Sequence, residues 1–557
     1  MNVLLETPDP YGAYPRLDDA QIHALAAEGR RHRTQSGEVL IREGEENYDF
    51  FVVLAGKVAN VDGFGGDERV LGVHGPKRFL GELSLFTGEA AFCTSQVREP
   101  GEVLRMPVER LKAVIADDSD LGDLILKAYL IRRSLLIGRG AGLRIIGSCF
   151  SPDNRRLREF AARNRIPYQW VDLEKDQDAE TLLRGLHVRP DQTPVVICPA
   201  GQVLRNPSNA ELARAVGLPA PQPGATLCDL AIVGAGPAGL AAAVYGASEG
   251  LQTVTLDAFA TGGQAGRSSR IENYPGFPAG ISGGELAERA VVQAKKFGAK
   301  FSVPAQARRL EQREGHYVIE LDNGGEVTAR TVLIATGVQY RKLDVPRFEE
   351  FEANSVYYAA TLSEALFCRD DPVAVVGGGN SAGQAALFLS KCTPVVHLLA
   401  RCEDLGETMS RYLVDRIETT PAVETHLRTE VRELLGGETL ERLVVEDKRT
   451  GQRREIPARA LFVFIGARPC TDWLTGQVTT DEDGFILTGP DSDEPDPPRR
   501  PLLQTNLPGV FAAGDVRRGS IKRVTSAVGE GATAVQLVWK YLQSAGRVGE
   551  DTAAALR

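Results

Sequence analysis

The sequence predicts a multidomain protein in which a β-barrel or jelly roll with flanking helices precedes a small α/β domain and two larger α/β domains. Three observations lead to this fold class. Short alternating strand-like runs fill residues 1–137, and strands alternate with helices through residues 141–218. Two glycine-rich turns, each between an apolar strand and a helix, then begin at positions 234 and 377. A chain of 557 residues has room for about three or four such domains.

Composition and charge narrow the function classes. The net charge of −10 and the pI near 5.5 argue against a general nucleic-acid binder. No run approaches the roughly 18 apolar residues of a membrane helix, and the start lacks the basic and apolar regions of a signal peptide. Eight scattered cysteines form no C-x-x-C pair and no zinc-ligand spacing, so we predict a cytoplasmic protein without a metal.

The first segment combines a helical stretch, "DAQIHALAAEGR", with the strand-like runs "GEVLIREGE", "YDFFVVLAGKVANVD", "CTSQV" and "GEVLRMPV" and a later helix, "LGDLILKAYLIRRSLLIGR". Through "IREGEENYDFFVVLAGKV" and "FLGELSLFTGEAAFCTSQV" it resembles the cyclic-nucleotide-binding domain family. The resemblance implies a phosphate-binding loop with Gly81 and Glu82, the glutamate taking the ribose hydroxyl. The family's arginine falls near Ala90 to Phe92, where no basic residue stands. A structural or dimerising role, or another small ligand, is therefore favoured over intact cyclic-nucleotide binding.

Residues 141–218 read as strand, helix, strand, helix, strand and a last helix, and they resemble a thioredoxin or glutaredoxin fold. Thr193-Pro194 stands where that family has its cis-proline. The two cysteine places at the first helix start hold Ser151 and Asn154. Cys149 lies two residues upstream and is interpreted as a packed residue rather than a lone thiol. We predict a domain without its own redox pair, followed by a Pro/Gly-rich linker at residues 219–226.

The first glycine-rich turn has the pattern of a Rossmann-like dinucleotide site. A buried strand, Leu230–Val233, runs into Gly234-x-Gly236-x-x-Gly239, and a second strand ends in Asp257. The glycines permit the tight turn, the approach of a pyrophosphate and close helix–strand packing, and the acid can bind a ribose diol. Pro237 and Ala238 belong to the same turn.

The second turn, 143 residues later, has Gly377, Gly379 and Ala382 in the three glycine places, with Asn380 and Ser381 between them. At the end of the next strand, where an NAD site places an acid, stand Ala400 and Arg401. An arginine can pair with a 2′-phosphate, which a carboxylate repels. The sequence therefore favours NADPH over NADH, and NADH stays the alternative.

Six motifs in order resemble the low-molecular-weight thioredoxin reductase family of flavoproteins. They are both turns together with "TGGQAGRSSRIENYPGFP", "VLIATGVQY", "LFVFIGARP" and "NLPGVFAAGDVRRGSIKRVTSAVGEGATAVQ". The resemblance implies an FAD-binding domain at 227–340 and 471–557 and an NAD(P)H-binding domain at 341–470. It also implies that a helix starts at Gly514 and Asp515. The flavin residues that it adds are Gly262, Gly263, Gln264, Asn273, Thr336, Gly337, Gly514, Asp515, Arg523 and Val524.

The family's redox-active cysteine pair is absent. Its two places, in "YYAATLSEA", hold Ala359 and Leu362, which cannot form thiolates. Cys368, just beyond, is interpreted as a packed residue. We therefore expect a cytoplasmic FAD-dependent NAD(P)H oxidoreductase that passes electrons to an external acceptor, such as a small redox protein or a quinone.

Two other hypotheses about the function remain open. One is a sensor flavoprotein with little turnover, and the other is a scaffold with vestigial cofactor sites. Resemblance to the family also implies a homodimer, and no nucleic-acid or membrane partner is expected.

Overall fold

The computed structural model describes residues 5–9, 11–45, 48–62, 68–82, 90–138, 142–148, 151–186, 188–198, 202–218, 227–268, 271, 273–352, 355–358, 360, 368–437, 439–474, 476–489 and 501–546. These ranges leave out Cys149, the linker 219–226, Ala359 and Leu362, so expectations about those residues lie outside the described structure. Within them, no helix is long and apolar enough to cross a membrane.

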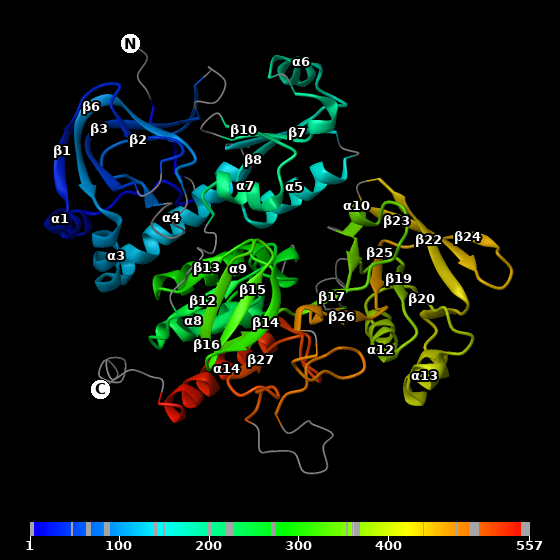
Figure 1. Cartoon of the computed structure of the whole chain (residues 1–557). Coiled ribbons are helices and arrows are strands. Elements are labelled where there is room, and N and C mark those ends of the chain that lie inside the picture. Colours follow the sequence, from blue (N-terminus) through cyan, green and yellow to red (C-terminus); the bar gives the residue numbers. More distant parts are fainter. Residues whose placement is uncertain are drawn as a thin grey trace.

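The N-terminal segment forms an antiparallel barrel-like sheet with strand order β1-β6-β3-β4, in which β2 pairs with β6 and β5 with β3. Its strands are β1 (Arg30–Thr34), β2 (Val39–Ile41), β3 (Phe50–Asp62), β4 (Arg69–His74), β5 (Phe79–Leu80) and β6 (Thr94–Met106). Its helices are α1 (Asp19–Glu28), α3 (Val108–Asp117) and α4 (Ser119–Gly138). Apolar residues of β3 and β6 pack against α1, α3 and α4 in one core. Helix α4 leads from the barrel toward the rest of the molecule (Figure 1).

The sequence expectation for this segment was wrong in one detail. Most of "CTSQV" and "GEVLRMPV" lies in one strand, β6, because the residues between them, 98–100, continue the strand through a β-bulge. A Cβ on Gly56, opposite the bulge, would lie 2.4 Å from the carbonyl oxygen of Glu99, so only glycine permits this approach. The arginine-rich strand β1 was not expected either, since it is exposed along most of its length.

The next sheet has the order β10-β9-β7-β8, with β7 and β8 parallel and the other neighbours antiparallel. It comprises β7 (Leu143–Gly147), β8 (Tyr168–Asp172), β9 (Val195–Ile197) and β10 (Val203–Arg205). Helices α5 (Pro152–Arg163), α6 (Gln177–Gly185) and α7 (Asn209–Ala215) accompany it. Ser151 caps α5 by accepting a hydrogen bond from the Asn154 amide, and Pro152 occupies the first turn. The Thr193–Pro194 peptide bond is cis.

The third sheet draws strands from two distant parts of the chain. Its order is β13-β12-β11-β16-β15-β14, and β27 pairs with β16 in parallel. The strands are β11 (Cys228–Val233), β12 (Thr253–Leu256), β13 (Lys300–Ser302), β14 (Ala307–Arg313), β15 (His316–Leu321), β16 (Glu326–Ile334) and β27 (Val510–Ala512). Helices α8 (Pro237–Ser248), α9 (Gly283–Lys296) and α14 (Val524–Ser544) share one apolar core with this sheet.

The fourth sheet is wholly parallel, in the order β18-β25-β19-β20-β21. It comprises β18 (Val356–Tyr357), β19 (Val373–Val376), β20 (Val396–Leu399), β21 (Val423–His426) and β25 (Ala460–Val463). Helices α12 (Asn380–Leu389) and α13 (Arg411–Glu418) share a core with one set of its side chains. The alternate side chains pack with α10 (Phe348–Glu352) and the small sheet of β22 (Thr429–Gly436), β23 (Leu440–Asp447) and β24 (Arg453–Pro457).

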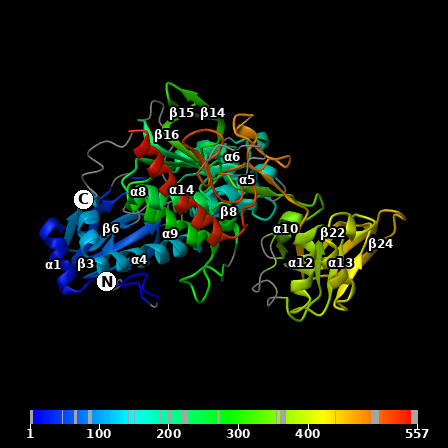
Figure 2. The ribbon, with the colours of Figure 1, turned by 90° about the horizontal axis from the view of Figure 1, so that it is seen from below.

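A two-stranded antiparallel ribbon, β17 (Val338–Tyr340) with β26 (Ala467–Pro469), joins the third and fourth sheets. The lobe around the fourth sheet stands to one side of the molecule in both views (Figures 1 and 2). The two glycine-rich turns therefore lie on separate lobes that a narrow connection links.

Candidate functional site

The first glycine-rich turn lies between β11 and α8. Gly234 has φ +109°, and a Cβ there would lie 2.2 Å from the carbonyl oxygen of Ala335, so the turn requires glycine. A Cβ on Gly239 would lie 1.8 Å from the carbonyl oxygen of Gly234, which shows how closely α8 approaches the strand. Gly236, by contrast, has open space around it, since a Cβ there would meet only the Cα of Gly263, at 3.8 Å. The start of α8, with Pro237 and Ala238 in its first turn, is thus open to a ligand.

Asp257 follows β12 directly and is held by three backbone N–H groups. Ala235 donates to one carboxylate oxygen at 2.8 Å, and Phe259 and Ala260 donate to the other at 3.0 and 3.1 Å. Burial raises the pKa of Asp257, while these N–H groups oppose the shift. The acid therefore fixes the turn itself, in addition to the ribose role expected from the sequence.

The segment with Gly262, Gly263 and Gln264 lies beside this turn. The Gly262 amide donates to the carbonyl oxygen of Ala235 at 2.7 Å, and Gln264 Nε2 donates to that of Val338 at 3.3 Å. Thr336 and Gly337 follow β16, and the Thr336 hydroxyl donates to the carbonyl oxygen of Cys470 at 2.8 Å. Asn273 is exposed, and no described contact ties it to the turn.

Gly514 also reaches the first turn, since a Cβ there would lie 3.1 Å from the Ala238 Cβ. The expectation that a helix starts at Gly514 and Asp515 was wrong: both lie in a turn after β27, and α14 begins at Val524 with Arg523 as its N-cap. The helix is nevertheless connected to this turn, because the Gly514 amide donates to Glu530 Oε2 at 2.7 Å. The resemblance thus implied a helix start at a position where the structure has the end of a strand and a turn.

Two tyrosines near this site were not found from the sequence. The rings of Tyr340 and Tyr358 stack with centroids 5.0 Å apart, and the Tyr358 hydroxyl donates to Glu352 at 2.8 Å. Burial and the charge of Asp515 raise the pKa of Tyr340 to about 12. Burial likewise raises the pKa of Asp515 to about 6, with Glu530 contributing. Tyr340 lies on β17 and Tyr358 directly follows β18, so their stacking brings together strands of two different sheets.

The small α/β unit also contacts this site. Arg163, at the end of α5, donates to the carbonyl oxygen of Gly263 at 3.0 Å and stacks on the Phe259 ring at 4.9 Å. Asn164 Nδ2 donates to the carbonyl oxygen of Phe259 at 3.1 Å. The segment between Asp257 and Gln264 is therefore held by two residues at the end of α5, in the small α/β unit.

The second glycine-rich turn lies between β19 and α12, with Gly379 as N-cap and Asn380 and Ser381 in the first turn. A Cβ on Gly377 would lie 2.5 Å from the carbonyl oxygen of Phe464 and 3.0 Å from the Cβ of the buried Ala382. Asn380 Oδ1 accepts from both the amide and the hydroxyl of Ser410, at 2.7 and 2.9 Å.

The end of β20 lies beside this second turn. A Cβ on Gly378 would be 3.3 Å from Cys402 Sγ and 4.0 Å from the Ala400 Cβ. Arg401 stands between these two residues and is exposed. The arrangement leaves a cation at the strand end where an acid would otherwise hold the ribose.

Glu82 of the N-terminal barrel does not face solvent. It is buried and pairs with Arg132 Nη1 of α4 at 2.7 Å. Arg132 also donates to the carbonyl oxygens of Ala13 and Phe79. A helix 50 residues further along the sequence thus supplies a cation to the glutamate that was expected to bind a ribose hydroxyl. Gly81 lies between β5 and Glu82, with φ +94°.

The described cysteines are single thiols. Cys368 is fully buried in an apolar cluster, as the packed interpretation predicted. At the start of α5, Asn154 is buried and donates to the carbonyl oxygen of Ser148 at 3.1 Å. A Cβ on Gly147 would lie 2.9 Å from Pro194 and 3.1 Å from Asn154, so the cis-proline stands close to Asn154 at the start of α5.

Comparison with known proteins matches two family models. Residues 228–531, more than half of the chain, match the pyridine nucleotide-disulphide oxidoreductase family, and residues 31–118 match the cyclic nucleotide-binding domain. Thioredoxin reductase from Treponema pallidum is 34% identical over 316 residues, covering 57% of this chain and 97% of that protein. A "34.2 kDa protein in rubredoxin operon" from Clostridium pasteurianum is 33% identical over 314 residues, 56% and 97% of the two chains.

A solved structure, thioredoxin reductase from Streptococcus pyogenes, matches with a TM-score of 0.51 and 32% identity. It covers 57% of this chain and 99% of that one. Proteins of the thioredoxin reductase type use FAD and NADPH. The chain therefore belongs to the pyridine nucleotide-disulphide oxidoreductase family as a thioredoxin-reductase-like oxidoreductase, with a cyclic nucleotide-binding domain ahead of the reductase region.

Proposed function

We propose that the protein takes hydride from NADPH onto FAD and passes the electrons to an external acceptor rather than to a dithiol of its own. The observation that carries this proposal is the pair of glycine-rich turns, both built as in a dinucleotide site, in a chain whose family cysteine places hold Ala359 and Leu362. FAD, when bound, supplies the acceptance and onward transfer of electrons.

The residues around the first turn fit FAD. The open side of Gly236 and the N-terminus of α8 suit a pyrophosphate, and Asp257 has carboxylate oxygens at the end of the second strand. We assign the remaining contacts to the residues that the structure brings near this turn, namely Gly234, Pro237, Ala238, Gly239, Gly262, Gly263, Gln264, Thr336, Gly337, Gly514 and Asp515. Arg523, Val524 and Asn273 stay predictions from the family motifs.

The second turn fits NADPH. Gly377, Gly379, Asn380, Ser381 and Ala382 would face the pyrophosphate, and the exposed Arg401 would pair with the 2′-phosphate. Rotation of the two lobes about the β17–β26 ribbon is the motion that the chemistry would need if nicotinamide and acceptor use the flavin in turn.

We interpret the unit of β7–β10 and α5–α7 as a thioredoxin-like domain that has lost its thiols. The sheet order, the cis Thr193–Pro194 bond and its place beside the start of α5 support this interpretation. Ser151 and Asn154 cannot exchange disulfides, so the unit is assigned a structural role: through Arg163 and Asn164 it holds the segment next to the flavin turn. The acceptor is then a separate small redox protein or a quinone. A cytoplasmic homodimer is the expected setting.

We further propose that a ligand of the N-terminal domain regulates the reductase through α4. Two adjacent arginines of this helix form ion pairs with different domains. Arg132 pairs with Glu82 in the barrel, and Arg133 pairs with Glu288 of α9 at 3.3 Å. Glu288 also accepts from the Tyr129 hydroxyl at 3.0 Å and pairs with Arg165 at 2.8 Å. A ligand that hydrogen-bonds to Glu82 must displace Arg132. This displacement would shift α4 and with it Arg133, which pairs with Glu288.

Anaerobic titration of the purified protein with NADPH and, separately, NADH tests the hydride step by the loss of flavin absorbance. Bleaching by NADPH at lower concentration than by NADH is the expected result. A yellow protein that neither nucleotide bleaches would favour the sensor role, and a colourless protein that takes up no added FAD would favour a scaffold.

Steady-state NADPH oxidation with ferricyanide tests the regulation. Arg132→Met and Arg133→Met should each change turnover, while Arg110→Met, which removes an exposed pair with Glu28, should not. Equal turnover in all three variants contradicts the regulatory proposal and leaves the hydride proposal intact.

A further inference from the structure

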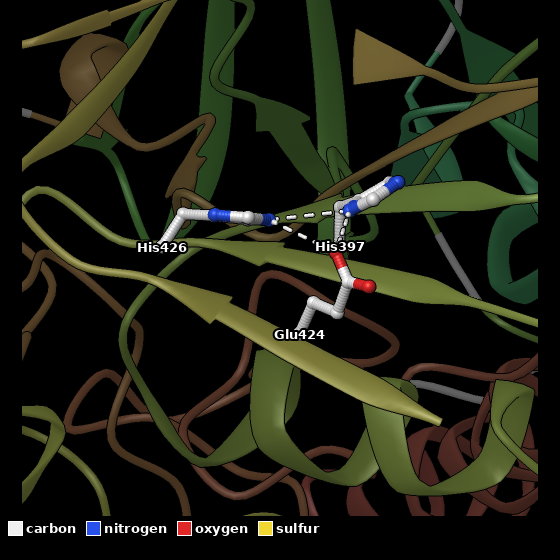
Figure 3. Close-up of side chains that lie close together, drawn as sticks. All are labelled: His397, Glu424 and His426. Atoms are coloured by element: carbon white, nitrogen blue, oxygen red, sulfur yellow. Dashed lines mark hydrogen bonds and ion pairs between the residues drawn. The ribbon is translucent and has the colours of Figure 1, made fainter. Parts of the chain in front are cut away.

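Two histidines and a glutamate meet on the edge of the fourth sheet (Figure 3). Glu424 and His426 are two residues apart on β21, so their side chains project from the same face of the strand. His397 of β20 pairs directly with Glu424 in the parallel register, which brings its side chain to the same face. The strands therefore place three potential metal ligands together without a loop.

The three ligand atoms form a triangle with two short sides and one longer side. His397 Nδ1 lies 3.1 Å from His426 Nε2 and 3.2 Å from Glu424 Oε2, and His426 Nε2 lies 3.9 Å from Glu424 Oε2. The point equidistant from three atoms with these separations is about 2.0 Å from each of them, which matches zinc–nitrogen and zinc–oxygen bond lengths. The three ligand atoms therefore lie close enough together to reach one common ion once the hydrogen bond between the two imidazoles is given up.

We propose that His397, Glu424 and His426 bind one divalent transition-metal ion, with Zn²⁺ as the best fit. Two imidazoles with one carboxylate suit zinc, whereas magnesium and calcium prefer oxygen ligands. The Glu424 side chain is 53% exposed while His397 is buried, so the open coordination position faces the solvent side of Glu424. A water molecule from that side can complete a four-coordinate site.

Arg454 of β24 fixes the tautomer of His426 in the metal-free protein. Its guanidinium donates to His426 Nδ1 at 2.7 Å, so in the metal-free protein the imidazole carries its proton on Nε2. Metal binding at Nε2 moves that proton to Nδ1, which then needs an acceptor instead of a donor. Arg454 is exposed and can swing away. A residue with a carbonyl oxygen at position 454 should therefore strengthen binding, while the native arginine weakens it.

The ion would fasten the edge strand β21 to β20 beyond their backbone pairing. The amide of Ala400, the residue before Arg401, donates to the carbonyl oxygen of His426 at 3.0 Å. The metal would hence hold the strand end beside the second glycine-rich turn. This consequence rests on the proposed NADPH site, but metal binding itself does not.

Isothermal titration of the full-length, chelator-treated protein with Zn²⁺ tests the proposal, with Co²⁺ absorption as a second readout. One ion per chain is expected, with a Co²⁺ spectrum typical of nitrogen and oxygen ligands and without a thiolate band. Glu424→Gln should weaken binding at least tenfold, and His426→Gln should remove it. Arg454→Gln should tighten it.

Glu441→Gln, on the exposed side of β23, is the matched control and should bind as the parent does. Thermal unfolding of the metal-free variants establishes that each is folded. Three outcomes overturn the assignment. The parent does not bind zinc, folded Glu424→Gln and His426→Gln still bind it, or the Co²⁺ complex shows a thiolate band. These outcomes are independent of NADPH-dependent bleaching, so failure of the metal site and failure of the proposed function can be told apart.

Discussion

Replacing Glu288 with glutamine tests whether the contact between α4 and α9 stabilises the assembled protein. The carboxylate is 8% exposed and is shared by Arg133, Arg165 and the Tyr129 hydroxyl. Gln retains the shape and can still accept from Tyr129, but it removes the one negative charge between two cations. Removing one partner of a buried ion pair costs about 3–5 kcal/mol. Because the Arg165 side chain is 21% exposed and can gain water, we expect the lower end, about 3 kcal/mol.

The assay is urea unfolding followed by far-ultraviolet circular dichroism and by tryptophan fluorescence. The first transition is the quantity to compare, because a chain of several domains need not unfold in one step. Glu285→Gln is the matched control on the same helix. Its exposed pair with Arg289 is worth no more than about 0.5 kcal/mol.

A double-mutant cycle then assigns the energy to the pair. Combining Glu288→Gln with Arg133→Met should recover about 1–3 kcal/mol, because it removes a buried cation together with its partner. A Glu288→Gln variant within about 0.5 kcal/mol of the parent, or a strictly additive double variant, would refute the reasoning.

Three further results are expected at the nucleotide sites. Gly239→Ala should give a protein that retains little flavin per chain, because its methyl group would displace α8 from Gly234. Visible absorbance of the purified protein measures the flavin content. Full flavin content would contradict the close packing of α8 against the turn. Arg401→Ala should raise the KM for NADPH about tenfold with that for NADH unchanged, since a single charge pair is lost; parallel changes for both nucleotides would argue against the 2′-phosphate role. Asp515→Asn should stabilise the flavin-free protein at pH 8 and not at pH 3. The pKa of Asp515 in the folded protein is raised to about 6, so its contribution to stability is complete below the pKa of the unfolded chain and is lost as the pH rises through 6. A constant difference between the urea midpoints of variant and parent across this pH range would contradict the prediction.

Local patterns predicted most of the elements. The strand–turn–helix units at Gly234 and Gly377 and the alternation through residues 141–218 each depend on neighbours in sequence, and the structure forms them there. The interruption expected at residues 98–100 was wrong, since a break and a bulge have the same local signature and only the approach of Gly56 distinguishes them.

The parts that could not be predicted depend on contacts between distant residues. Glu288 is an ordinary polar residue of an amphipathic helix until α4 and Arg165 meet it. Glu424 and His426 carry a readable signal, because ligand residues two apart on a strand share a face. His397, however, joins them only through the register of β20 with β21, which the sequence does not specify. Arg132 likewise supplies a cation to Glu82 from 50 residues away in the chain.

The pairing of β27 with β16 has a consequence for the order in which the protein is made. β27 and α14 follow the entire second nucleotide lobe in the chain, yet both complete the sheet and core around the first turn. During synthesis from the N-terminus, the lobe with β18–β25 is a continuous segment and can fold as soon as it emerges. The flavin turn must wait for residues beyond 510, so until then the ribosome-bound chain exposes the apolar surface of α8 that α14 later covers. Premature termination in the second lobe would thus leave an N-terminal fragment with an open hydrophobic face, a substrate for chaperones and proteases rather than a partial enzyme.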